Sequence, residues 1–522
     1  MAPPSPVTTG CTIGPPYAGI RVGAIDAATP AALAAILTTL RAVCDVRLLE
    51  SGVGEPRPGG LTTYLLTAAQ IDALWSDLGV RVRVYVPDLG ATLAAAESVV
   101  DDGMAEQPPS RPVPAPLTGG GAGGGLPPGM LGLATSPRAN TSTAADGLAA
   151  AAASTPAPVL SAAAATEFYT AYRSLTAVNR RMELLAADYP GVAATIPIGK
   201  SVLGRQLTAL AVGHTPADAP VRLVVLGLQH AREWVAGLVP LYTGEMLVRG
   251  AAEHPDLAAF LTRVQLLFVP MVNPDGFVYT VTTDRMWRKN RSDDGSTCPG
   301  VDLNRNWGVD WGGPHATSTV EPCRETYTGA APFSEPETTA IRDLIDAHPG
   351  IVGFIDFHAY GELVLGAWAH AEEPPADRPN DKAYGMAVTD GVNRVHASGY
   401  RYGTGGEFIY LASGVASDWA TAANMSAVTI ELRPNNAPGA GLSLGTEFLL
   451  PASEVLPTCE EGMGGVIGAA RFLERAARGG DDDLEFVGKA GAELDDLHRA
   501  DAAGDAHDEA VEIGRASCRE RV

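Results

Sequence analysis

The larger part of the chain contains four continuous apolar runs. They are residues 221–228, 264–272, 350–357 and 425–432. Runs of this kind are typical of strands buried in a sheet that is covered on both faces. Helical patterns at 235–250 and 335–348 lie between them. The alternation predicts a large α/β domain over residues 166–475, whose functional site should lie at the ends of strands.

The first hundred residues alternate strand and helix patterns on a smaller scale. Strand signals cover residues 19–25, 44–50, 61–66 and 80–86. Between the first two, a helical stretch places four apolar side chains on one face, namely Leu33, Ile36, Leu37 and Leu40. Between the last two, Thr67 followed by Gln70 has the form of a capping box at a helix start. This order predicts a small α+β split sandwich of the ferredoxin-like type over residues 1–100.

Composition marks two further segments. Residues 101–165 are rich in Gly, Pro and Ala, which predicts a linker, and a trypsin-like protease could reach Arg111 and Arg138 within it. Residues 476–522 are acidic and have few apolar anchors, which predicts a solvated, disordered tail. The last eleven of these, 512–522, resemble one reading frame of a sequencing adapter, and we expect them to be an assembly artefact.

Charge, hydropathy and cysteine content argue against a nucleic-acid-binding protein, a membrane protein and a disulfide scaffold. The net charge of −23 argues against nucleic acid or an anionic membrane as a partner, because both repel an acidic surface. No stretch is apolar enough for a transmembrane helix, and the first residues lack the apolar core of a signal peptide, which could be missing from an incomplete transcript. The 6 cysteines are too few for a disulfide scaffold, yet Cys298 and Cys323 bracket a loop-rich segment and could pair. Sequons at Asn140, Asn290 and Asn424 give weak support for secretion.

Two histidines and a glutamate stand at predicted strand ends. The segment "GLQHAREWVA" places His230 and Glu233 three positions apart, directly after the apolar run at 221–228. By itself this spacing often arises by chance. His358 in "IDFHAYGE" ends another apolar run, and the three residues together are the ligand set of a catalytic zinc that keeps its fourth position for water. The alternative is that both histidines are satisfied by hydrogen bonds at strand ends.

Four further polar residues are candidates for chemistry. Asn304 and Arg305 are adjacent in "CPGVDLNRNWG", and an amide beside a guanidinium can grip a carboxylate, although a solvated loop is the plainer alternative. Arg288 in "RMWRKNRS" is ambiguous by itself. Glu431 in "TIELRP" ends a buried strand, where desolvation would raise the pKa of its carboxylate toward that of a useful general base.

Together these motifs resemble the zinc metallocarboxypeptidases of the carboxypeptidase A/B type, which are made as zymogens. The resemblance covers residues 18–100 and 166–475. It runs, in order, through "HAREW", "NPDGF", "RMWRKNRS", "VDLNRNW", "CRETYTG", "FSEPET", "DFHAYGE", "IYLASG", "SDW", "IELR" and "LLPASEVLPT". It implies a large mixed, eight-stranded type of sheet with helices on both faces, preceded by an inhibitory pro-domain.

The resemblance also assigns catalytic roles. His230, Glu233 and His358 would bind one zinc ion, and Asp302 would orient His230. Glu431 would take a proton from the attacking water and pass it to the leaving amine.

The remaining assignments concern the substrate. Arg288 and the zinc would stabilise the oxyanion. Asn304 and Arg305 would hold the free C-terminal carboxylate, Tyr410 would close over it, and Arg232 would contact the peptide further back. Cleavage would therefore remove residues from the C-terminus of peptides and proteins.

The specificity pocket lacks the acidic residue that relatives with basic specificity carry. Its matching positions are Gly405, Ala412, Val415, Ser417 and Thr429. A neutral pocket favours aromatic or aliphatic C-terminal residues. The alternatives are a carboxypeptidase B-like preference for Lys and Arg, and a catalytically silent relative that only binds peptides. Silent relatives typically lose the base or a zinc ligand, and this chain keeps both.

The resemblance finally predicts how the protein is processed. Residues 1–165 would be removed by a trypsin-like protease, with Arg138 as the preferred candidate for the cleavage site and Arg111 as the second candidate. Cys298 and Cys323 match the disulfide positions of the family, which favours a secreted, extracellular or vacuolar protein. We expect a monomer.

Overall fold

The structure is a computed structural model that describes most of residues 166–478 and parts of the N-terminal hundred. The described ranges are 166–213, 221–293, 295, 298–315, 318–376, 378–435 and 447–478, with 20–26, 36, 47–48, 61–67, 70–71, 74, 83–86 and 100–101. The predicted linker from residue 102 onward, with Arg111 and Arg138, and the predicted acidic tail beyond residue 478 lie outside the described residues.

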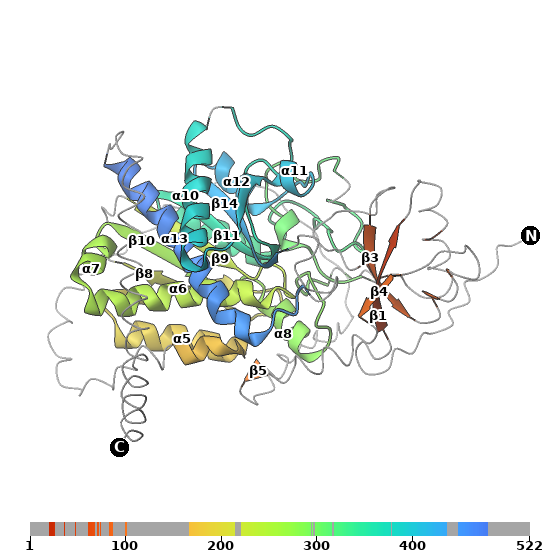
Figure 1. Ribbon diagram of the computed structural model, residues 1–522, viewed down its shortest axis with the longest axis horizontal. Coiled ribbons are helices and arrows are strands. Elements are labelled where there is room, and N and C mark those ends of the chain that lie inside the picture. Colours follow the sequence, from red (N-terminus) through yellow and green to blue (C-terminus); the bar gives the residue numbers. More distant parts are fainter. Residues whose placement is uncertain are drawn as a thin grey trace, which may run out of the picture. The chain divides into compact units, whose positions relative to one another are not determined.

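A sheet of eight strands organises the large domain (Figure 1). Its order is β13 (Arg401–Thr404), β12 (Leu363–Gly366), β14 (Ser426–Asn435), β11 (Ile351–Gly361), β9 (Val221–Gly227), β10 (Val264–Val269), β8 (Gln206–Val212) and β7 (Ala193–Lys200). The four central strands β14, β11, β9 and β10 are mutually parallel and coincide with the four apolar runs of the sequence. Antiparallel pairing attaches β8 to β10, β7 to β8, and β12 to β14. The predicted mixed sheet is confirmed.

Helices cover both faces of this sheet, as the continuous apolar strands require. Along β9, Leu223 and Val225 belong to one apolar cluster, whereas Val224 and Leu226 belong to another, because successive side chains point to opposite faces. The first cluster includes residues of α5 (Leu175–Asp188), α6 (Trp234–Glu253), α10 (Pro379–His396) and α13 (Val455–Ala477). The second includes residues of α9 (Pro336–Ala347) and α12 (Ala416–Ala422).

Shorter elements complete the large domain. They are α7 (Pro255–Leu261), α8 (Pro274–Thr282), α11 (Gly405–Phe408), η1 (Phe168–Thr170), η2 (Leu303–Arg305) and η3 (Ala452–Glu454). Among the helices that the structure describes, none is long and apolar enough to cross a membrane.

The N-terminal strands form a separate four-stranded sheet. Its order is β2 (Arg47–Leu48), β3 (Leu61–Thr67), β1 (Ile20–Asp26) and β4 (Arg83–Val86), and every pairing is antiparallel. Ile36, between β1 and β2, and Leu74, between β3 and β4, are helical and buried. These elements follow the predicted strand and helix order. A short parallel pair joins β5 (Val100–Asp101) to β6 (Tyr172–Arg173).

Candidate active site

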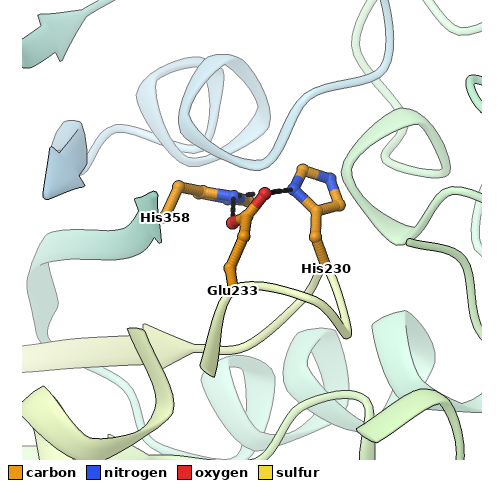
Figure 2. Close-up of side chains that lie close together, drawn as sticks. All are labelled: His230, Glu233 and His358. Carbon is orange, nitrogen blue, oxygen red and sulfur yellow. Dashed lines mark hydrogen bonds and ion pairs between the residues drawn. The ribbon is translucent and has the colours of Figure 1, made fainter. Parts of the chain in front are cut away.

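Three side chains meet at one end of the sheet, two from the turn after one strand and one from the neighbouring parallel strand. His230 and Glu233 lie in the turn between β9 and α6, where Glu233 is the residue just before the helix starts. His358 lies in β11, which pairs with β9 in parallel. Because carboxyl ends of parallel strands share one edge, residues more than a hundred positions apart are brought together, as Figure 2 shows.

The three side chains present their coordinating atoms to one point. Oε1 of Glu233 lies 2.8 Å from Nδ1 of His230, and Oε2 lies 2.9 Å from Nδ1 of His358. The two Nδ1 atoms are 2.9 Å apart, and all three residues are buried. Two ring nitrogens at this distance cannot both carry a hydrogen toward each other, so at least one presents a lone pair to the common point.

This donor set fits a zinc ion. Two imidazole nitrogens and a carboxylate oxygen, all within 4.8 Å of one another, are the ligand types of a catalytic zinc. A tetrahedral ion about 2.1 Å from each donor would hold the donors roughly 3.4 Å apart. The observed separations of 2.8 to 2.9 Å therefore need only small side-chain rotations to admit the ion.

The outer nitrogen of His230 contacts a second carboxylate. Oδ1 of Asp302 lies 3.0 Å from Nε2 of His230, and Oδ2 accepts from Nη2 of Arg288 at 2.9 Å and from its Nε at 3.1 Å. Burial alone would raise the pKa of Asp302, but the charge of Arg288 and the hydrogen bond with His230 hold it well below its ordinary value. Asp302 is therefore a fixed anion behind the ligand.

The outer nitrogen of His358 has an equivalent partner that the sequence analysis missed. Oδ2 of Asp356 lies 2.8 Å from Nε2 of His358 and accepts from Nε2 of Gln229 at 2.5 Å. Asn304 also approaches this ring, with its Nδ2 3.2 Å from Nε2. A signal was present in the sequence, because residues two apart on a strand share a face, and Asp356 stands two positions before His358.

Glu431 and Arg288 flank the three candidate ligands. Glu431 lies on β14 in register with His358 on β11. Although its side chain keeps some contact with solvent, the packed surroundings desolvate the carboxylate and raise its pKa to about 8. Nη1 of Arg288 lies 4.0 Å from Oε1 of Glu233. Both residues therefore lie beside the three candidate ligands.

The amide and guanidinium pair also lies beside the site. Asn304 and Arg305 occupy the 3-10 turn η2 and are buried. Nη1 of Arg305 donates to the carbonyl of Asn304 at 2.7 Å, and Nη2 donates to the hydroxyl of Tyr410 at 3.1 Å. Oδ1 of Asn304 accepts from the backbone N–H of Ala416 at 2.9 Å, which fixes the amide. Asn304, Arg305 and Tyr410 therefore form one connected group.

The predicted pocket residues are buried, and two of them are joined. Thr429 Oγ1 donates to Ser417 Oγ at 3.3 Å, which links β14 to α12. Thr429 is also in register with Asp356 across β11 and β14. The other three are Gly405, Ala412 and Val415.

Arg232 lies between two side chains that the sequence analysis did not single out. Its guanidinium sits 4.3 Å from the ring centre of Phe448, and Nη1 is 3.7 Å from Oε2 of Glu325. Glu325 keeps some solvent exposure. These contacts join segments far apart in the chain, so no local sequence pattern predicts them.

A disulfide closes the loop that carries Asp302, Asn304 and Arg305. Cys298 and Cys323 are bonded, with a Cα–Cα distance of 4.8 Å, so the predicted pair is present. The enclosed segment contains Asp302, Asn304 and Arg305.

A protein family, several relatives and a solved structure resemble this chain. A model of the zinc carboxypeptidase family matches residues 178–465. Carboxypeptidase A1 of Mus musculus is 35% identical over 295 residues, which cover 56% of this chain and 68% of that protein. Carboxypeptidase B of Astacus astacus is 34% identical over 311 residues, which cover 59% of this chain and 98% of that protein. The solved structure of carboxypeptidase A from Helicoverpa armigera has a TM-score of 0.65 at 24% identity and covers 89% of this chain and 100% of that chain, which shows a shared fold.

Proposed function

The chain belongs to the zinc carboxypeptidase family, and we propose that His230, Glu233 and His358 bind its zinc ion. The observation that carries this assignment is the convergence of three buried donor atoms within 4.8 Å. The orientation of both rings supports it, because each turns Nδ1 toward Glu233 and Nε2 toward a second carboxylate. When bound, the zinc ion would act as a Lewis acid that polarises the scissile carbonyl and lowers the pKa of the attacking water.

The residues around the ligands would carry the proton and charge transfers. Glu431 would accept a proton from the attacking water and deliver it to the leaving amine. Its raised pKa of about 8 supports this role, because a base works best when its pKa is near the working pH. Arg288 would place its guanidinium beside the oxygen on which negative charge develops. Its buried contact with Asp302 would keep it oriented.

The Asn304, Arg305 and Tyr410 group would restrict cleavage to the C-terminal residue. A buried guanidinium and amide recognise a carboxylate through directed, charge-assisted hydrogen bonds. A substrate without a terminal carboxylate leaves these groups unmatched, which weakens its binding in the reactive position. The hydroxyl of Tyr410, in contact with Arg305, would close over the bound end.

The pocket formed by Gly405, Ala412, Val415, Ser417 and Thr429 would favour aromatic or aliphatic C-terminal residues, because none of these five carries charge. A preference for Lys and Arg is the second candidate. Two observations favour it: the similarity to the carboxypeptidase B of Astacus astacus, and the buried Asp356 in register with Thr429. Rates on peptides that end in Phe, Leu, Lys and Arg distinguish the two.

The N-terminal sheet would belong to an inhibitory pro-domain that is removed with the linker, at Arg138 or Arg111. The protein would then be a zymogen of a secreted, extracellular or vacuolar enzyme. The Cys298–Cys323 bond supports an oxidising compartment. The sequon at Asn290 gives no support, because this side chain is fully buried and donates to Glu335.

One assay tests this function. The full chain is incubated with peptides ending in Phe and in Arg, before and after trypsin, with and without a zinc chelator. We expect chelator-sensitive release of the C-terminal residue that increases after trypsin. A zinc-loaded, trypsin-treated protein that binds these peptides but releases nothing would instead be a silent peptide-binding relative.

A further inference from the structure

A buried carboxylate outside the three candidate ligands lies against His358. Asp356 is fully buried in β11, and its Oδ2 is 2.8 Å from Nε2 of His358. The strand itself fixes this contact, since the two residues are two positions apart on one face. β11 is a central strand, paired on both sides with parallel strands, so its backbone has little freedom to move.

The two histidines have similar partners, although Nδ2 of Asn304 also lies 3.2 Å from Nε2 of His358. Each turns Nδ1 to the shared point with Glu233, and each turns Nε2 to a fully buried aspartate. The distances are 3.0 Å for His230 and Asp302 and 2.8 Å for His358 and Asp356. What the family resemblance implies for Asp302 therefore has a geometric counterpart on the other ring.

Asp356 is itself held in place by a chain of hydrogen bonds. Gln229 donates from Nε2 to Oδ2 of Asp356 at 2.5 Å, and Oε1 of Gln229 accepts from Nε1 of Trp307 at 3.1 Å. Trp307 is buried against Phe354. Within the described part of the chain, Oδ1 of Asp356 has no hydrogen-bond partner. Burying a carboxylate oxygen without a hydrogen bond costs free energy, which argues that the contact between Asp356 and His358 has a function.

We propose that Asp356 is a positioning residue that accepts the Nε2 hydrogen of His358, so that the Nδ1 lone pair of this ring points to the zinc. This inference rests on the proposed ligand assignment. A carboxylate on the outer nitrogen selects one tautomer, restricts rotation of the ring and makes the inner nitrogen more basic, all of which strengthen metal binding. Both histidine ligands would then be oriented by aspartates from different parts of the chain.

Two other roles for Asp356 lead to different results. As a purely structural partner of Gln229, it would affect the stability of the fold but not the affinity for zinc. As a charged wall of the specificity pocket, next to Thr429 in register, it would affect the preference for basic C-terminal residues instead.

The test is the zinc dissociation constant of Asp356→Asn and Asp356→Ala, measured by competition with a chromophoric chelator. Replacing an outer-sphere partner typically weakens metal binding by about 10–100-fold. We expect the upper part of this range for Asp356→Ala and about tenfold for Asp356→Asn, because the amide oxygen can still accept a weaker hydrogen bond. The matched control is Asp381→Asn, because Asp381 is a buried carboxylate that contacts Arg378 and Ser426, away from the ligands. This control should bind zinc within twofold of the wild type.

Each outcome has a definite meaning. If Asp356→Asn binds zinc within twofold of the wild type, the positioning role is wrong, whether stability or the ratio of Lys to Phe cleavage changes instead. If Asp356→Ala does not fold, the isosteric Asp356→Asn decides the question. The increase in melting temperature that zinc produces gives a second readout, and it should be smaller in Asp356→Asn than in the wild type. A wild-type protein that binds no zinc would contradict the proposed ligand assignment itself.

Discussion

His358 and Glu431 are register partners on the adjacent parallel strands β11 and β14. Neighbouring strands lie about 4.8 Å apart, and paired residues point their side chains to the same face. The separation between a proposed metal ligand and the proposed base is therefore set by the hydrogen bonds of the sheet rather than by a loop. This relationship explains how a site assembled from distant segments can hold its groups in a fixed arrangement.

Glu431 should control the acid side of the pH profile. A base acts only when deprotonated, so kcat/KM should fall as the pH drops below the pKa of Glu431. The protein environment raises this pKa from 4.5 to about 8, and a bound dication favours the anion and lowers it again. We expect the acid limb of kcat/KM between these two values, and a loss of about 10²–10⁴-fold in kcat for Glu431→Gln. Activity that stays level down to pH 4, or a fully active Glu431→Gln, would exclude this role.

Arg305 should determine the discrimination between free and blocked C-termini. Arg305→Ala removes charge-assisted hydrogen bonds to the substrate carboxylate, which are worth about 1.5–3 kcal/mol each, so kcat/KM on a free-acid peptide should fall about 10²-fold. The C-terminal amide of the same peptide should be hydrolysed slowly by the wild type and no more slowly by the variant. Arg305→Lys, the control that keeps the charge but loses the planar fork, should recover part of the discrimination. An unchanged ratio of free-acid to amide rates in Arg305→Ala would show that Arg305 does not bind the C-terminal carboxylate.

Much of the fold could be predicted from the sequence, because the central strands are buried on both faces. That burial produces the uninterrupted apolar runs of β9, β10, β11 and β14. The outer strands β7 and β8 were not predicted. β7 alternates irregularly between buried and exposed positions and contains Pro197, so it has neither a continuous run nor a clean period of two.

The candidate site was predictable where residues follow strands. His230, His358 and Glu431 each stand at the end of an apolar run, and parallel strands bring such ends together. Asp356 and Gln229 were not predicted as part of the site. Nε2 of Gln229 lies 2.5 Å from Oδ2 of Asp356, but the two residues are 127 positions apart in the sequence. Side-chain contacts between two strands depend on register, which a local hydrophobic pattern does not give.

Glu337 should make the fold less stable as the pH rises toward neutrality. Its burial raises its pKa from 4.5 to about 7, and the charges of Asp275 and Glu335 add to the shift. The folded state therefore binds this proton more tightly than the unfolded state, so the free energy of unfolding falls as the pH rises from about 4.5 to 7. Urea unfolding at pH 4.5 and 7.5 measures the effect, which is at most about 3 kcal/mol for this group.

The matched variant for this test is Glu337→Gln. It resembles the protonated acid and can still accept the backbone N–H of Val202. The loss of stability between the two pH values should be smaller in the variant than in the wild type. Equal losses in the two proteins would show that Glu337 does not titrate in this range.

The Cys298–Cys323 bond should stabilise the loop that carries Asp302, Asn304 and Arg305. The bond spans 25 residues, and closing a loop of that length removes about 3 kcal/mol of unfolded-state entropy. Replacing both cysteines by serine should lower the free energy of unfolding by this order, as measured by urea titration. The control is Cys459→Ser, which replaces the buried free thiol among the described cysteines and keeps the Cys298–Cys323 bond, so a reductant should lower its stability as much as that of the wild type. A double variant as stable as the wild type would show that the bond adds nothing to stability.

We infer that this chain removes C-terminal residues with a zinc ion held by His230, Glu233 and His358. The most direct measurement is the initial rate of release of the C-terminal residue from a free-acid peptide by the trypsin-treated protein, first metal-free and then with zinc restored. We predict that the rate is lost on chelation and returns with one equivalent of zinc in the wild type, but not in His358→Ala. A metal-free protein that keeps its rate, or a His358→Ala variant that recovers it fully with one equivalent of zinc, would show that these three residues do not hold a catalytic zinc.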